Sequence, residues 1–203
     1  MLTVVLVRHG ATAWNENAYC QGRKDVPLSA LGKRQVTLLE EAQSGLFFDR
    51  IYASPLSRAL ETARLLGYEP DVLDDLAEID RGHWEGHPMD EVKRRWGKLY
   101  RAWYEDPEGL VLPGGEAFDD FWARAQRALD AVCAAVDGRV LVCAHKAINR
   151  AIIARALGMK TAEVWAIPQP QAGRSVLVRE DGSWRAEVLG SADHLPEELR
   201  SEN

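Results

Sequence analysis

The chain has 203 residues, of which 46% are hydrophobic and 28% charged, so it can fill one substantial core. Its net charge of −6 argues against a nucleic acid or an anionic membrane as a partner. No stretch approaches the roughly 20 apolar residues that a membrane-spanning helix needs. Any anionic substrate must therefore be attracted by a local basic cluster. Three cysteines without a CxxC pair favour a reducing, cytoplasmic environment.

Short apolar strands alternate with amphipathic helices along most of the chain. The strands are predicted over residues 2–7, 49–53, 139–143, 175–179 and 184–189. The helices are predicted over residues 29–45, 54–66, 116–136 and 145–158. Ser54 and Pro55 are expected to supply the N-cap and the first position of the second helix. Asp181-Gly182 predicts a hairpin turn, and the polar tail after Leu195 is expected to fray.

Residues 84–113 have a different composition, with five aromatic residues among many charges: Trp84, Trp96, Tyr100, Trp103 and Tyr104. Their apolar positions recur at helical spacing, which predicts one or two helices forming a cap or side insertion on a single domain of residues 1–203. The aromatic side chains are expected mainly in the core of this cap, although some could stack on a substrate ring. Its basic run, residues 93–95, could meet a second charge on the substrate, although a solvated helix face is the expected arrangement.

The alternation of strands and helices predicts an α/β fold around a mostly parallel sheet. In such sheets, ligands bind beyond the carboxyl ends of the strands. Two of the inner strands end in histidine, because residues 2–7 lead to His9 and residues 139–143 lead to His145. These two histidines are therefore expected to share a site.

Five polar residues are singled out, and most of them have an ordinary explanation when taken singly. They are Arg8, His9, Arg58, Glu78 and His145. A histidine after a strand can be a packed or capping residue, an arginine in a first helical turn can pair with a surface glutamate, and Glu78 can be a solvated loop carboxylate.

Together, the same five residues indicate phosphoryl chemistry. Arginine forks match the oxygens of a phosphate dianion, and a neutral imidazole is a competent nucleophile. A second histidine can stabilise charge that develops on the phosphoryl oxygens. A carboxylic acid can protonate the departing ester oxygen.

Six ordered motifs carry a resemblance over nearly the whole chain, from Leu2 to Leu195. They are LVRHGATAWN, QGRKDVPLSALGKRQ, IYASPLSRALETA, LAEIDRGHWEG, LPGGE and VLVCAHKAINR. This series resembles the histidine phosphatase superfamily, the phosphoglycerate mutase-like family. The resemblance implies a three-layer α/β/α sandwich. It also implies that His9 is phosphorylated, that Arg8, Arg58 and His145 complete the phosphate pocket, and that Glu78 is the proton donor.

The resemblance further implies residues that bind substrate. Asn15 matches an additional pocket residue, and Gln21 and Gly22 match a segment on the substrate side. Two positions depart from the usual pattern, because Ala11 follows RHG and Lys146 follows the second histidine. Lysine at this position can interfere with the usual backbone geometry or can reach a second anionic group on the substrate, and the sequence does not decide between these alternatives.

Length and motif favour a phosphatase over a mutase. The mutases of the family are longer and read LNERHYG around the acid, whereas this chain reads LAEIDRGHWEG. The phosphatase branch includes α-ribazole phosphatases and broad-specificity phosphatases, so the expected substrate is a small phosphate ester. The alternatives are a cofactor-dependent phosphoglycerate mutase and a non-catalytic phosphate-binding module. No metal and no cofactor are expected, and a homodimer stays open.

Overall fold

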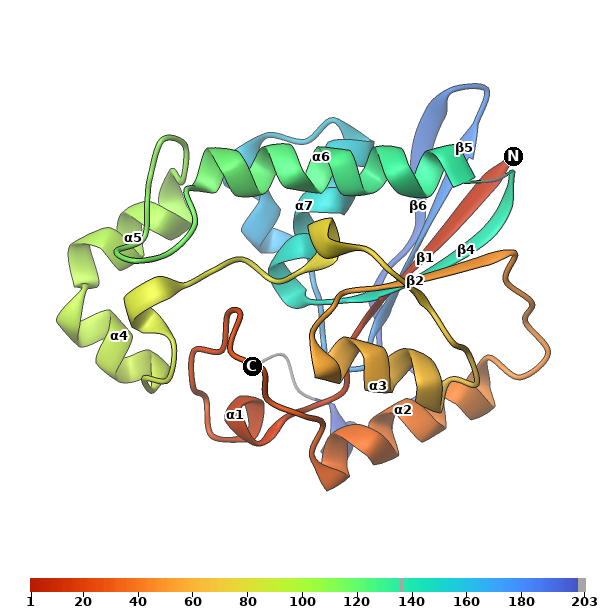
Figure 1. Ribbon diagram of the computed structural model, residues 1–203, viewed down its shortest axis with the longest axis horizontal. Helices are drawn as coiled ribbons and strands as arrows, with labels where there is room; N and C mark the ends of the chain where they lie inside the picture. Colours follow the sequence, from red (N-terminus) through yellow and green to blue (C-terminus); the bar gives the residue numbers. More distant parts are fainter. Residues whose placement is uncertain (136, 201–203) are drawn as a thin grey trace.

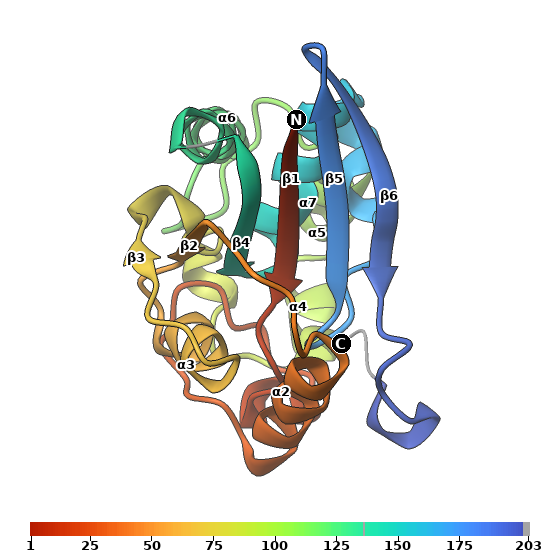
Figure 2. The ribbon, with the colours of Figure 1, turned by 90° about the vertical axis from the view of Figure 1, so that its right-hand side faces the viewer.

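Within residues 1–135 and 137–200, which the computed structural model describes, a six-stranded sheet runs in the order β3-β2-β4-β1-β5-β6 (Figures 1 and 2). The strands are β1 (Leu2–Arg8), β2 (Arg50–Ala53), β3 (Asp71–Val72), β4 (Gly138–Ala144), β5 (Arg174–Glu180) and β6 (Ser183–Ser191). β4 pairs in parallel with β1 and β2, and β2 pairs in parallel with β3, whereas β5 is antiparallel to β1 and β6. The predicted α/β fold with a mostly parallel sheet is confirmed.

Helices cover both faces of this sheet. The α-helices are α1 (Ala13–Glu16), α2 (Ala30–Ala42), α3 (Ser57–Leu65), α4 (Met89–Arg95), α5 (Gly97–Glu105), α6 (Phe118–Ala135) and α7 (Lys146–Leu157). Short 3-10 helices are η1 (Asp74–Leu76), η2 (Gly82–Trp84), η3 (Thr161–Ala166) and η4 (Glu197–Leu199). Figures 1 and 2 show α2 and α3 on one face and α6 and α7 on the other.

Strand β1 shows why the fold has three layers. Its side chains alternate between two apolar clusters, as the pleat of a strand requires. Leu2, Val4 and Leu6 pack in the cluster that includes α6 and α7. Val5 and Val7 pack in the cluster that includes α2 and α3. A strand buried on both faces is typical of a sheet sandwiched between helical layers, as predicted.

The central strands place the two histidines side by side. Arg8 lies opposite Ala144 in the parallel β1–β4 ladder, so His9 and His145 follow at the same edge of the sheet. The His9 backbone N–H donates to the Ala144 carbonyl at 3.0 Å, which continues the pairing one residue beyond the strand.

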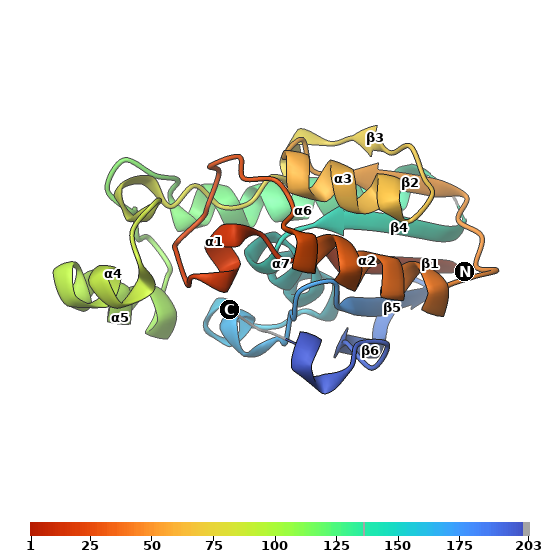
Figure 3. The same cartoon turned by 90° about the horizontal axis from the view of Figure 1, so that it is seen from below.

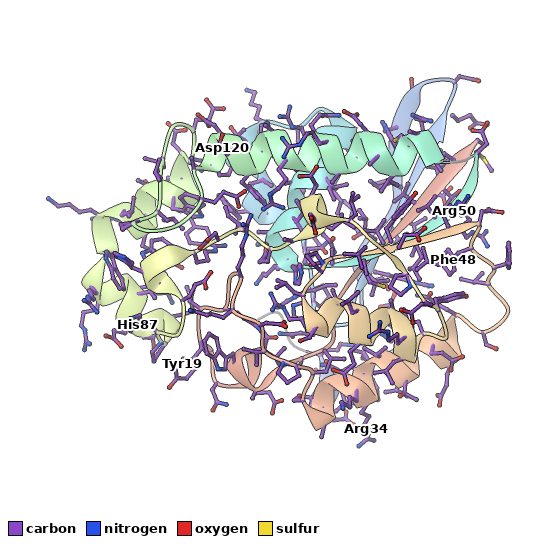
Figure 4. The ribbon with its side chains drawn as sticks, in the orientation of Figure 1. Tyr19, Arg34, Phe48, Arg50, His87 and Asp120 are labelled. Carbon is purple, nitrogen blue, oxygen red and sulfur yellow. The ribbon has the colours of Figure 1, made fainter. Side chains whose placement is uncertain are left out.

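The α4–α5 segment (residues 84–113) stands to one side of the sandwich (Figures 1 and 3). Trp84 and Trp103 are fully buried within it, with ring centroids 6.3 Å apart. Figure 4 shows Tyr19 and His87 on neighbouring segments, where the loop after α1 meets the α4–α5 segment. This loop is held there because the Cys20 N–H donates to the His87 carbonyl at 2.9 Å.

Two local predictions are wrong. Helix α3 begins at Ser57 with Leu56 as its N-cap, not at Ser54, because the Ser54 hydroxyl is engaged by His145 and by the Leu56 N–H. The tail does not fray directly after Leu195, since η4 follows and the Leu199 carbonyl accepts a 2.7 Å hydrogen bond from buried Gln35.

Other predictions on the C-terminal half hold where the structure describes the chain. Asp181 and Gly182 have φ angles of 49° and 81° and form the predicted hairpin turn between β5 and β6. The predicted helix over 116–136 corresponds to α6, and residue 136 and the tail end, 201–203, lie outside the described residues. Among the described helices, none has both the length and the apolar character needed to cross a bilayer.

Candidate active site

A cavity of about 560 Å³ opens at the carboxyl ends of β1 and β4, and the α4–α5 segment contributes to its wall. The predicted site residues that line it are Arg8, His9, Asn15, Gln21, Gly22, Arg58, Glu78 and Lys146. The remaining predicted residue, His145, is fully buried behind this lining and contacts Arg58. The structure therefore brings all the predicted site residues to one place.

His9 is held in one tautomer by its neighbour. Its Nδ1 lies 2.7 Å from the Gly10 carbonyl oxygen, which can only accept, so Nδ1 carries the proton and Nε2 carries the lone pair. Burial, followed by the charges of Arg58 and Arg8, lowers the pKa of His9 well below that of an ordinary histidine. His9 is therefore neutral at pH 7 and has the lone pair that a nucleophile needs.

Gly10 is required where the chain leaves His9. A Cβ atom on Gly10 would stand 2.4 Å from the Gly32 carbonyl oxygen in α2. Only glycine lets the two backbones approach this closely. The loop after β1 thus packs against the start of α2, which fixes the carbonyl that orients the His9 ring.

Arg58 connects the two histidines. Its Nε–H is shared between His9 Nε2 and His145 Nδ1, each at 3.2 Å. Its terminal nitrogens donate to the carbonyls of Lys24 at 2.9 Å and Gly22 at 2.8 Å. Only 1% of Arg58 is exposed, so the alternative of a surface arginine paired with a glutamate is wrong. Burial lowers the pKa of Arg58 to about 10, which leaves it charged at neutral pH.

His145 is the N-cap residue of α7, and its ring lies 5.1 Å from that of His9. Because its Nδ1 accepts from Arg58, its Nε2 carries the proton and donates to Ser54 Oγ at 2.7 Å. Burial, followed by the charge of Arg58, lowers the pKa of His145 well below that of an ordinary histidine. Ser54, predicted as a helix N-cap, is instead the hydrogen-bond partner of His145, a contact that was not predicted. Its position directly after β2 is the one signal that places it at the same sheet edge.

Glu78 contacts the start of the same helix, α7. Its carboxylate accepts hydrogen bonds from the Ala147 N–H at 3.1 Å and from the Ile79 N–H at 2.9 Å. The Ala147 N–H lies in the first turn of α7, where a helix presents unpaired donors to an anion. Glu78 is therefore anchored at the cavity wall, and it is not a solvated loop carboxylate.

The predicted substrate-side residues are also fixed. The amide oxygens of Asn15 and Gln21 lie 3.0 Å and 3.2 Å from the Thr12 hydroxyl. The Gln21 Nε2 is buried and has no hydrogen-bond partner among the described residues, so it is a donor available to a ligand. Arg8 is 2% exposed, and one of its terminal nitrogens donates to the Gln169 carbonyl at 2.6 Å.

Further residues of the cavity were not predicted as site residues. The cations Arg81 and Arg150 and the aromatic side chains of Tyr104 and Trp165 also line it. Arg150 follows Lys146 by four residues in α7, a spacing that puts both on one face of a helix, so this position could have been found from the sequence. Trp165 lies in η3, and no local pattern connects it to the site.

An α/β sandwich with buried histidines and arginines at the carboxyl ends of its central strands has the features of a phosphate-ester-binding protein. The family model of the histidine phosphatase superfamily (branch 1) matches residues 4–192. The chain belongs to this superfamily, which confirms the predicted resemblance.

Relatives of the chain carry phosphatase names. It is 34% identical over 95% of its length to a probable 2-carboxy-D-arabinitol-1-phosphatase from Arabidopsis thaliana, of which the match spans 42%. It is 33% identical over 89% of its length to phosphoserine phosphatase 1 from Hydrogenobacter thermophilus, of which the match spans 88%. The crystal structure of α-ribazole phosphatase from Shigella flexneri superposes with a TM-score of 0.84 at 27% identity and covers 94% of this chain and 96% of that chain. These names agree with the predicted class, a phosphoric monoester hydrolase.

Proposed function

We propose that the protein hydrolyses small phosphate monoesters through a phosphohistidine formed on His9. The observation that carries this proposal is the tautomer of His9: its Nδ1–H is bound to the Gly10 carbonyl, and its Nε2 lone pair points at the Arg58 guanidinium. A phosphate placed against Arg8 and Arg58 would meet this lone pair. The hydrogen bond to Gly10 also favours the positive charge that the ring gains when it is phosphorylated.

The reaction has two steps. In the first, His9 Nε2 bonds to phosphorus while the ester oxygen leaves and takes a proton from Glu78. In the second, water attacks the phosphohistidine and gives its proton to Glu78, so that phosphate leaves and His9 is restored. Arg8 and Arg58 stabilise the charge on the phosphoryl oxygens in both steps. His145 supports Arg58 in this role, because its Nδ1 accepts from the Arg58 Nε–H and its Nε2 donates to the Ser54 hydroxyl.

The test of this function separates it from the two alternatives. We expect turnover of p-nitrophenyl phosphate in the presence of EDTA, and release of phosphate without isomerisation of 3-phosphoglycerate to 2-phosphoglycerate. Isomerisation faster than phosphate release would identify a mutase. Binding of phosphate without turnover of any ester would identify a non-catalytic module.

Arg58→Ala is expected to lower kcat by about 100- to 1000-fold, the usual loss of one transition-state donor. The matched control is Arg64→Ala, which removes an exposed arginine of the same helix that pairs with Glu69. Steady-state kinetics with p-nitrophenyl phosphate measure both variants. A change in KM alone would mean that Arg58 binds substrate and transition state equally, contrary to the proposed role. His145→Ala is expected to behave as Arg58→Ala does.

The substrate class is proposed from the charges of the cavity. Beyond the residues assigned to the phosphoryl group, Arg81, Lys93, Lys146 and Arg150 bring four further cations to its wall, against one further carboxylate, Asp90. This local excess contrasts with the acidic chain as a whole, so we infer that the ester carries a second anionic group. The names of two relatives fit a carboxylate, since carboxyarabinitol phosphate and phosphoserine both contain one.

Lys146→Met tests this substrate class. With phosphoserine as substrate, loss of one charged hydrogen bond of about 1.5–3 kcal/mol should raise KM by about 10- to 100-fold. The KM for p-nitrophenyl phosphate should stay unchanged. Lys98→Met is the control, because Lys98 is an exposed lysine of α5 outside the cavity lining. Equal effects on both esters would contradict recognition of a second anion by Lys146.

The α4–α5 segment is proposed to cover the bound substrate. The α4–α5 segment supplies Met89, Lys93, Tyr100 and Tyr104 to the cavity, which supports its role as a cap over the substrate. A cytoplasmic location, the lack of a nucleic-acid partner and a homodimer stay predictions from the sequence.

A further inference from the structure

The proposed two-step hydrolysis assigns no role to the LPGGE motif, residues 112–116. Its last residue, Glu116, pairs with Arg124 of α6 in a two-pronged ion pair with N–O distances of 2.9 Å and 2.8 Å. The side chains are only 12% and 7% exposed. Burying two charges costs free energy unless their hydrogen bonds are satisfied. The other hydrogen-bond partners of Glu116 and Arg124 therefore indicate which segment of the chain this ion pair fixes in place.

The other N–H groups of Arg124 are directed at the backbone that leads to Glu78. One terminal nitrogen donates to the carbonyls of Asp75 at 2.8 Å and Ala77 at 2.7 Å. The other lies 3.5 Å from the carbonyl of Glu78 itself. With the two bonds to Glu116, all five N–H groups of the guanidinium are directed at oxygen. The chain from η1 to Glu78 is thus fixed by one side chain.

A second arginine repeats the arrangement. Arg23 donates from Nε to the Glu78 carbonyl at 3.2 Å, and its terminal nitrogen lies 3.3 Å from Glu116. The carbonyl of Glu78 is therefore held by two arginines that share one carboxylate. The carboxylate of Glu78 points away from this cluster, to the Ala147 N–H at the cavity wall.

The backbone of the motif is fastened to the residues that follow Glu78. The Glu116 N–H donates to the Asp80 carbonyl at 3.1 Å, and the Asp80 N–H donates back to the Glu116 carboxylate at 3.3 Å. A Cβ atom on Gly115 would stand 2.6 Å from the Asp80 carbonyl oxygen, so glycine is needed for this approach. The segment is therefore restrained on both sides of Glu78.

We propose that Arg124 and Glu116 are positioning residues for Glu78, which they hold so that its carboxyl group reaches the oxygen of the leaving group. Neither residue lines the cavity, so both act through Glu78 and not on the substrate. The inference rests on the proposed role of Glu78 as the general acid. It assigns to the LPGGE motif a role outside the phosphate pocket.

Arg124→Lys tests the inference. Lysine keeps the charge but has three donors on a single nitrogen, so it cannot span the three carbonyls and Glu116. A displacement of Glu78 by about 1 Å should lower kcat/KM on an alkyl phosphate by about 100-fold. The kcat/KM on p-nitrophenyl phosphate should change little, because this parameter reports the transfer to His9 and the leaving group needs no proton. Arg127→Lys is the matched control, because Arg127 lies one turn further along α6 and pairs with the Asp75 side chain at the surface.

A double-mutant cycle separates positioning from general damage. If Arg124 acts through Glu78, adding Arg124→Lys to Glu78→Gln should cost little more on the alkyl ester. Losses that multiply, or equal losses on both esters, would overturn the inference. Glu116→Gln replaces Arg124→Lys if the latter does not fold, with the same readouts. Equal losses on both esters in Glu78→Gln alone would instead overturn the general-acid role on which the inference rests.

Discussion

His9→Ala is expected to abolish turnover of every phosphate ester. The covalent step needs a lone pair in line with phosphorus, and His9 Nε2 is the atom whose tautomer is fixed for this purpose by the Gly10 carbonyl. His145 cannot replace it, because His145 is fully buried, does not line the cavity and is held between Arg58 and Ser54. Steady-state turnover of p-nitrophenyl phosphate and of an alkyl phosphate measures the effect.

The control for His9→Ala is His83→Ala, which removes an exposed histidine of η2. This variant should keep wild-type activity. A thermal unfolding curve establishes that His9→Ala is folded, as expected for the loss of a small ring from a site fixed by backbone contacts. Folded His9→Ala with wild-type turnover would contradict the proposed mechanism.

Glu78→Gln is expected to lower kcat/KM on alkyl phosphates by about 100- to 10000-fold. Glutamine has nearly the same shape and can still accept from the Ala147 N–H, but it cannot transfer a proton to the leaving oxygen. The loss should be far smaller on p-nitrophenyl phosphate, because p-nitrophenolate is stable without a proton. The measurement is kcat/KM for both esters in the wild type and the variant.

The difference between the two esters decides the role of Glu78. Equal losses would contradict general-acid catalysis. A larger loss on the activated ester would indicate that Glu78 acts mainly in placing His9 or, if the loss is in kcat, in hydrolysis of the phosphohistidine. Glu69→Gln, a change at an exposed carboxylate, serves as the control and should leave both rates unchanged.

The sheet and the position of the histidines could be predicted because they depend on local patterns. Continuous apolar runs define β1 and β4, and parallel pairing of two such strands brings the residues after them together. The predicted neighbourhood of His9 and His145 therefore required no knowledge of the tertiary structure. The hairpin turn at Asp181-Gly182 likewise follows from the backbone angles that these two residues tolerate.

Contacts between distant segments could not be predicted in this way. Serine is a common helix N-cap, but the Ser54 hydroxyl is hydrogen-bonded to His145, which is 91 residues away. This tertiary hydrogen bond prevails over local capping. The tail appears polar in sequence, yet buried Gln35 binds the carbonyl of Leu199 and so orders it. The role of the Glu116–Arg124 pair could not be predicted for the same reason. Arg124 reaches the backbone at Glu78 only because η1 and Glu78 lie beside α6 in the folded protein.

The central claim is that the phosphoryl group passes through His9, and the most direct measurement is to trap it there. Wild-type enzyme is mixed with a radiolabelled phosphate ester, quenched within the first turnover, and digested for peptide mapping. We predict a label that is lost in acid, survives in alkali, as phosphoramidates do, and maps to the peptide containing His9, with no label in His9→Ala. An acid-stable label on a serine, or labelling of His9→Ala, would contradict the account.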